Sequence, residues 1–176
     1  IQSLYGFVDK ETRFRKYKKG ILDVGRKNGK STIDGGLGNY MLTSDGEGGA
    51  EVYSVATKKD QAKVVWEEAK RMIKKSPVLA KRVRCLFYDK TESFFKALAS
   101  DSNSLDGLNA YFVICDEVHA WKDKNLLDVM YDSMSAREQP LLLETSTMGT
   151  VRESVFDKMI LLKEQNKHCR RKRKWN

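Results

Sequence analysis

Apolar and polar residues are arranged along this chain in segments that predict strands and helices in alternation. Apolar side chains recur at helical spacing from Ala62 to Ile73, which predicts an amphipathic helix capped by Thr57 and followed by Pro77. Further helices are expected over 30–42, where three glycines weaken the prediction, over 124–135, and from about residue 154. Short apolar or alternating runs predict strands over 18–24, 51–56, 83–88, 93–98, 111–115 and 141–145.

Strands separated by helical segments are typical of βαβ units and of a mostly parallel sheet. The fully apolar run over 111–115 predicts a strand that is buried on both faces, and the strands over 83–88 and 93–98 predict a hairpin. In open α/β sheets, ligands bind at the carboxyl ends of the central strands. Polar clusters that directly follow predicted strands are therefore the candidates for function.

Length and composition limit the class of protein. The chain has 176 residues, which suffices for one domain with a hydrophobic core. No segment reaches the roughly 18 apolar residues of a membrane span, and the first ten residues lack the pattern of a secretory signal. The three cysteines are widely spaced and form no CxxC pair. A membrane protein, a disulfide scaffold and a zinc module are thus not expected.

The net charge of +9 lies mainly in the last 14 residues. Residues 163–176 carry seven lysines and arginines against one acid, and residues 1–162 carry the remaining +3. A basic run is usually solvated and only weakly indicates polyanion binding. We therefore predict a domain over 1–162 and a basic C-terminal tail over 163–176, and charge alone does not assign a function.

The first polar cluster, GRKNGKS, follows a predicted strand and precedes a predicted helix. It matches the second half of the phosphate-loop pattern G-x-x-x-x-G-K-S/T, although its first glycine comes one position late. In such loops, backbone N–H groups surround phosphates, the lysine reaches the β- and γ-phosphates, and the hydroxyl binds Mg²⁺. A surface turn is the alternative. The predicted nucleotide-binding residues are Gly25, Arg26, Lys27, Asn28, Gly29, Lys30, Ser31 and Thr32.

The second cluster is the pair Asp116-Glu117, which directly follows the apolar run YFVIC. A carboxylate in this place can hold Mg²⁺, because hard cations prefer oxygen ligands. An adjacent glutamate can orient or deprotonate the water that attacks a phosphoryl group. A surface pair that caps the next helix is the alternative interpretation.

The third cluster consists of the hydroxyls of Thr145, Ser146 and Thr147 at the end of another predicted strand. Such hydroxyls can sense a γ-phosphate and transmit its loss to neighbouring elements, although strand ends rich in serine and threonine are common. One nucleotide could contact all three clusters. Together they predict a nucleotide hydrolase.

Several segments, in order from Leu4 to Phe156, resemble the large terminase subunit of tailed bacteriophages, specifically its N-terminal ATPase domain. They include VGRKNGKST, GGAEVYSVATKKDQA, SFFKALASDSNSLDGLNA, YFVICDEVHAWKD and AREQPLLLETSTMG. The resemblance implies a P-loop NTPase of three-layer α/β fold, with a mostly parallel central sheet and helices on both faces. It also implies Mg²⁺ and ATP as ligands, with Ser31 and Asp116 on the metal, Glu117 as the catalytic acid, and residues 145–147 as the coupling motif.

The resemblance further implies a motor that drives double-stranded DNA into a capsid. The expected partners are DNA, the portal protein and the small terminase subunit, with a homo-oligomeric ring during packaging and a monomer in isolation. The expected location is the cytoplasm of the bacterial host, with transient docking on the procapsid and no membrane contact.

Two departures from the family qualify these expectations. The family's C-terminal nuclease domain lies beyond this sequence, so we expect no nuclease activity from it. Many relatives carry an arginine before the glycine where this chain has Asp106-Gly107, so Arg137 becomes the candidate for an arginine that acts on a neighbouring subunit. An ordinary surface salt bridge is the other interpretation of Arg137.

Gln2 is the nearest candidate for the family's adenine-side glutamine. Gln61 and His119 could each face the site, or lie on the surface. The alternative function is a truncated, catalytically weak nucleotide- or DNA-binding module of prophage origin. A helicase-type motor shares the layout but needs a second motor domain.

Overall fold

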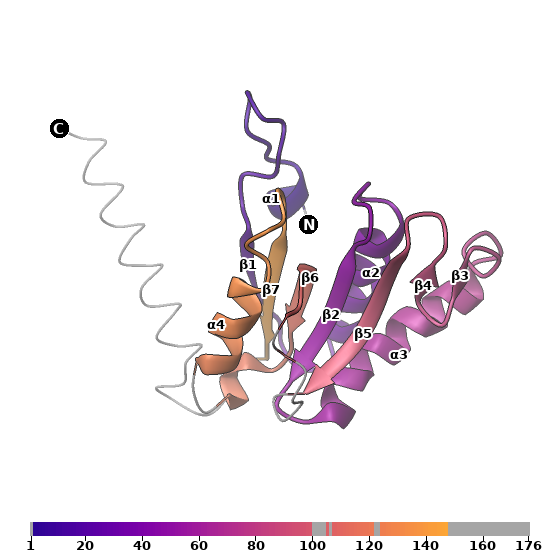
Figure 1. Cartoon of the computed structure of the whole chain (residues 1–176). Coiled ribbons are helices and arrows are strands. Elements are labelled where there is room, and N and C mark those ends of the chain that lie inside the picture. Colours follow the sequence, from indigo (N-terminus) through magenta and orange to yellow (C-terminus); the bar gives the residue numbers. More distant parts are fainter. Residues whose placement is uncertain (1, 100–104, 106, 122–123, 148–176) are drawn as a thin grey trace.

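The computed structural model describes residues 2–99, 105, 107–121 and 124–147, which form one sheet with helices on both faces. Figure 1 shows the elements from the first helix to the last strand. In chain order they are α1 (Gln2–Tyr5), β1 (Lys19–Asp23), α2 (Lys30–Thr43), β2 (Glu51–Ala56), α3 (Lys59–Lys75), β3 (Val83–Arg84), β4 (Phe87–Tyr88), β5 (Ser93–Ala99), β6 (Ala110–Cys115), the 3-10 helix η1 (Val118–Ala120), α4 (Asn125–Asp132) and β7 (Leu141–Ser146).

The strand order in the sheet is β1-β7-β6-β2-β5-β4-β3. The first five strands in this order run parallel, and the short strands β4 and β3 continue the sheet in antiparallel pairing. The carboxyl ends of β1, β7, β6 and β2 therefore lie along one edge. Because β7 lies between β1 and β6, the segment after β1 and the segment after β6 flank the end of β7.

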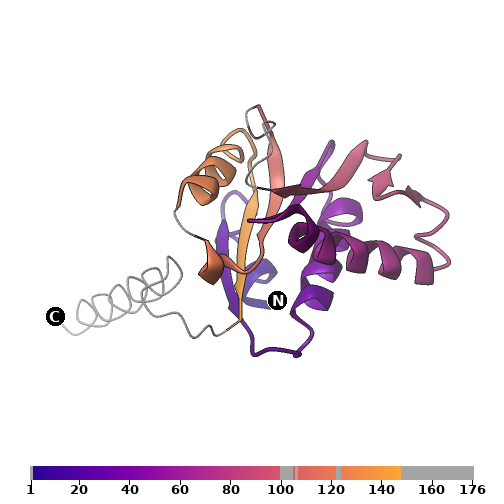
Figure 2. The same ribbon diagram turned by 90° about the horizontal axis from the view of Figure 1, so that it is seen from below.

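Helices cover the two faces of the sheet and produce the three-layer α/β fold that the sequence predicts. The cluster on one face joins α2 and α3 to the sheet through Leu37, Met41, Val65 and Ile73. The cluster on the other face joins η1 and α4 to the sheet, and Figure 2 shows α4 on the side away from α2 and α3. Strand β6 is buried along its whole length, which confirms the interpretation of its apolar run.

Two details differ from the sequence prediction. The strand expected over 83–88 is divided, because Cys85 (φ 47°) and Leu86 (φ 58°) adopt left-handed conformations and fold β4 back on β3. Helix α3 begins one residue later than expected, with Lys58 rather than Thr57 at its N-cap. The helix expected from residue 154 and the basic tail over 163–176 lie outside the described residues.

The glycines of α2 allow close packing that compensates for their low helix propensity. A Cβ atom on Gly35 would lie 2.9 Å from the backbone nitrogen of Ala69 in α3, and one on Gly38 would lie 2.5 Å from the Phe95 ring. The amide of Asn39 donates a hydrogen bond to the Ala69 carbonyl at 3.0 Å. Tertiary contact therefore outweighs the propensity cost of about 1 kcal/mol for each glycine.

Candidate nucleotide-binding site

The loop between β1 and α2 forms a tight turn that ends at the first residue of the helix. Lys27 (φ 64°) and Gly29 (φ 75°) both adopt left-handed conformations, and Gly29 is the N-cap of α2. At φ 75° glycine avoids the steric cost that a Cβ atom would bring. The turn places the positive end of the α2 dipole at the carboxyl edge of the sheet, where it favours an anion.

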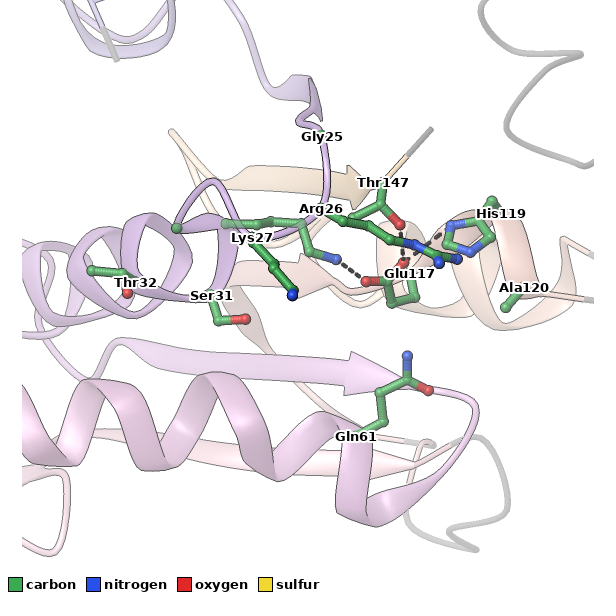
Figure 3. A pocket seen from close by; sticks show the side chains of 12 residues that line it. Gly25, Arg26, Lys27, Ser31, Thr32, Gln61, Glu117, His119, Ala120 and Thr147 are labelled. Carbon is green, nitrogen blue, oxygen red and sulfur yellow. Dashed lines mark hydrogen bonds and ion pairs between the residues drawn. The ribbon is translucent and has the colours of Figure 1, made fainter. Parts of the chain in front are cut away.

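A pocket of about 580 Å³ opens at this edge, within the size range of small-molecule sites. The phosphate-loop residues that line it are Gly25, Arg26, Lys27, Gly29, Lys30, Ser31 and Thr32, while Asn28 is not among the lining residues. The other residues that line it are Gln61, Glu117, His119, Ala120 and Thr147. Figure 3 shows Ser31, Gln61 and Glu117 directed into this space from three different elements.

Lys30 is buried and joins the phosphate loop to both acids of the second cluster. Its Nζ atom lies 2.6 Å from Asp116 Oδ1 and also donates to Glu117 Oε1. Burial acts to lower the pKa of Lys30, but the hydrogen bonds from Lys30 to Asp116 and Glu117 outweigh it and raise the pKa. The lysine is therefore a charged group held at the pocket wall, 86 residues in sequence from the acid that it contacts.

Glu117 is the second residue after β6 and the N-cap of η1, and its left-handed conformation (φ 52°) turns the chain into that helix. Its Oε2 atom accepts a hydrogen bond from the Thr147 hydroxyl at 3.2 Å and lies 3.1 Å from His119 Nδ1. Burial would raise the pKa of Glu117, but its contact with Lys30 outweighs burial and lowers the pKa. Glu117 is therefore an ionised carboxylate in the pocket at neutral pH.

A second layer of polar side chains lies buried behind the pocket. Asp116 accepts a hydrogen bond from the Thr145 hydroxyl at 3.2 Å, and Thr145 and Ser146 are fully buried at the end of β7. Asp34, one helical turn after Lys30, is also fully buried, and neither of its carboxylate oxygens has a hydrogen-bond partner among the described residues. Burial, reinforced by the nearby charge of Asp116, raises the pKa of Asp34 to about 7.

The oxygen donors at this edge fit Mg²⁺ in the presence of a nucleotide. Ser31 lines the pocket and Asp116 lies directly behind it, and both supply the hard oxygen ligands that Mg²⁺ prefers. Among the described residues, no group of three or more acidic, histidine or cysteine side chains forms a metal site. Mg²⁺ usually binds through one or two protein ligands together with substrate phosphates and water.

Arg137 does not join the other predicted site residues. It precedes β7 and therefore lies at the opposite, amino edge of the sheet, where its guanidinium contacts Glu47 at 2.8 Å and the Gly49 carbonyl at 2.7 Å. It also donates to the Asn109 carbonyl at 3.2 Å, and only 12% of its side chain is exposed. Within this chain, these bonds correspond to the salt-bridge interpretation of Arg137.

The structure adds three residues to the site that the sequence left open or missed. Gln61, in the first turn of α3, and His119, in η1, both line the pocket. The sequence could have indicated both residues, because they follow β2 and β6, and these two strands end at the same edge of the sheet. Asp34 had no such signal, because it lies inside a glycine-rich helix whose register against the sheet is not apparent from the sequence.

A phosphate loop after β1, an acid pair after β6 and one strand between them define the class: a P-loop domain with a nucleotide-type pocket. The family model for the terminase large subunit, ATPase domain, matches residues 1–164. The chain belongs to that family.

Solved structures of phage large terminases share this fold. The large terminase of bacteriophage HK97 superimposes with a TM-score of 0.74 at 24% identity, covering 85% of this chain and 33% of that protein. The ATPase domain of the Thermus phage P74-26 large terminase gives a TM-score of 0.58 at 18% identity, covering 85% of this chain and 69% of that one. The present chain thus spans about a third of the HK97 protein. No curated protein matches it. Among the described residues, no helix is long and apolar enough to cross a bilayer.

Proposed function

We propose that this chain binds and hydrolyses Mg-ATP as the motor domain of a phage large terminase, and that hydrolysis drives double-stranded DNA into the capsid. The observation that carries the proposal is the contact of Lys30 with both Asp116 and Glu117 at the wall of the pocket. One cation and two acids from distant segments meet at the place where a phosphate group would enter. The family match supports the same function.

The residues divide the chemistry between them. The loop over 25–32 binds the phosphates through its backbone N–H groups, and Lys30 leaves the acids to pair with the phosphate oxygens. Ser31 and Asp116 would hold Mg²⁺, which neutralises phosphate charge when it is bound. Glu117, once released by Lys30, orients the attacking water and accepts its proton.

The coupling motif is proposed to report the state of the γ-phosphate to the rest of the domain. Thr147 contacts Glu117, and Thr145 contacts Asp116, so the end of β7 is bonded to both acids. A change at either acid is therefore felt at the start of the segment after β7. DNA, the portal protein, the small terminase subunit and neighbouring copies in a ring are the proposed partners. The proposed location is the host cytoplasm.

The arginine that completes the site in trans is left unassigned. Such an arginine contributes about 10³ to 10⁵ in rate, so the isolated chain should turn over slowly. Binding is therefore a better first test than turnover.

The test is calorimetric titration of the folded chain with Mg-ATP. Lys30→Ala should weaken binding by at least roughly 30-fold, because it removes a buried cation that pairs with phosphate. Lys63→Ala, which removes an exposed lysine outside the pocket, is the matched control and should bind as the parent does. Equal affinity of Lys30→Ala and Lys63→Ala in folded proteins would contradict the nucleotide site.

Glu117→Gln tests the catalytic assignment separately from binding. It should keep Mg-ATP binding and lower the single-turnover rate by about 10² to 10⁴, the usual contribution of a general base. An unchanged rate in a folded variant would show that Glu117 does not act on the water.

A further inference from the structure

The two oxygens of Glu117 face different partners. Oε1 accepts a hydrogen bond from Lys30, the residue that leaves the acids for the phosphates in the proposed function. Oε2 accepts a hydrogen bond from the Thr147 hydroxyl and lies 3.1 Å from His119 Nδ1, and neither residue belongs to the phosphate loop. Figure 3 shows both groups on the same side of the Glu117 carboxylate. One oxygen is therefore exchangeable, while the other is anchored to the end of β7.

One ring nitrogen of His119 lies close to two partners. Its Nδ1 atom lies 2.8 Å from the Ser146 hydroxyl and 3.1 Å from Glu117 Oε2. Ser146 is fully buried and donates to the Thr147 carbonyl at 3.2 Å, so the anchor is itself fixed. The His119 side chain is only 18% exposed, which restricts its rotation. The imidazole thus links Glu117, at the end of β6, to the last residue of β7.

This link matters most when Lys30 is withdrawn. The Glu117 carboxylate would then keep a single hydroxyl contact, from Thr147, if His119 were absent. One hydrogen bond leaves a carboxylate free to rotate, and a misplacement of 1 Å at a reacting group can cost about 10²-fold in rate. A second contact on the same oxygen removes that freedom.

We propose that His119 is a positioning residue that holds Oε2 of Glu117 against the end of β7 and leaves Oε1 as the oxygen that faces the attacking water. The proposal rests on the proposed function of Glu117. His119 does not touch the reacting atoms in this scheme. It acts through the carboxylate that it orients, and through Ser146 it makes that orientation depend on the position of β7.

A pair of substitutions separates this role from simple packing. The side-chain amide of asparagine can occupy the position of histidine Nδ1, whereas that of glutamine can occupy the position of Nε2. We expect His119→Asn to retain most of the single-turnover rate, and His119→Gln and His119→Ala to lose about 10- to 100-fold. The KM for ATP should stay within about twofold in all three, because His119 positions the carboxylate rather than the phosphates. Equal rates for His119→Asn and His119→Ala would overturn the proposal.

A spectroscopic measurement tests the contacts of His119 with Glu117 and Ser146 without any need for ATP turnover. The chain contains two histidines, so the ¹⁵N spectrum of a histidine-labelled sample is simple, and His119→Asn identifies the His119 signals. Glu117→Gln and Ser146→Ala should each shift the Nδ1 resonance of His119, and Lys63→Ala should not. An Nδ1 resonance that neither substitution moves would overturn the proposal.

Mg-ATP titration of the parent chain keeps the two hypotheses apart. Failure of the parent to bind would contradict the proposed function and leave the spectroscopic result to decide on His119. Binding by the parent, with unchanged kinetics in all three His119 variants, would overturn the inference while the proposed function stands.

Discussion

The two edges of the sheet hold buried charges in different ways. At the amino edge, Arg15 pairs with Asp45 at 2.6 Å, and Arg137 pairs with Glu47 at 2.8 Å. Each arginine also donates to backbone carbonyls, of Gln139 and of Gly49 respectively. One cation faces one carboxylate in each pair, so charge is balanced within the fold.

At the carboxyl edge the charges are not balanced. Lys30 contacts Asp116 and Glu117, and Asp34 is buried close to them without a hydrogen-bond partner among the described residues. A single lysine thus faces three carboxyl groups. The amino edge therefore helps to hold the chain together, whereas at the carboxyl edge the acids outnumber the one lysine that contacts them, and a Mg²⁺ ion would supply positive charge there.

The largest expected effect is a loss of stability when an ion pair at the amino edge is broken. Arg15→Ala removes the cation that Asp45 and the Tyr111 hydroxyl contact, and it leaves a buried carboxylate unpaired. We expect the free energy of unfolding to fall by about 3–5 kcal/mol, measured by urea denaturation. The adjacent exposed lysine offers a control, since Lys16→Ala should change stability by less than about 0.5 kcal/mol. Similar losses in both variants would contradict the structural role of the Arg15–Asp45 pair.

The next effect tests the carboxyl edge, where we expect a substitution to stabilise the chain rather than destabilise it. Because the pKa of Asp34 is raised to about 7 from 3.8, the folded chain keeps a proton that the unfolded chain loses at lower pH. The free energy of unfolding should therefore fall as the pH rises from about 4 to about 7, by up to roughly 4 kcal/mol, and then level off.

Asp34→Asn should remove this contribution to the pH dependence and make the chain more stable than the parent at pH 8. Urea denaturation of both proteins from pH 4 to pH 9 measures how the free energy of unfolding depends on pH. Parallel curves for the two proteins would show that Asp34 ionises freely in the folded chain.

The smallest expected effect tests whether the amino edge contributes to stability without influencing nucleotide binding at the carboxyl edge. Arg137→Ala should lower the free energy of unfolding by about 1–3 kcal/mol, because Glu47 and the Gly49 carbonyl lose a donor. Mg-ATP affinity should stay unchanged, since Arg137 lies at the far edge of the sheet. A large loss of affinity in the folded variant would contradict the separation of the two networks.

The sequence predicted the parts that depend on local pattern. The phosphate loop, the buried strand β6 and its acid pair follow from short motifs and periodicity, so their positions at strand ends could be inferred. The contacts of Arg15 and Arg137 could not, because they join residues 28–124 positions apart, and single-sequence patterns carry no information on such pairs. Cys85 and Leu86 look like ordinary strand residues, and only the packed fold shows that they adopt positive φ.

The contact between α2 and α3 sets a fixed dimension in the molecule. At Gly35 the two helices meet backbone to backbone, with no side chain between them whose rotamer could change. The phosphate loop leads into α2, and Gln61 lies in the first turn of α3. The distance between the phosphate loop and Gln61 is thus set in part by a main-chain contact. In mechanical terms, α2 and α3 form one rigid wall of the pocket, and Glu117, His119 and Thr147 belong to the other wall.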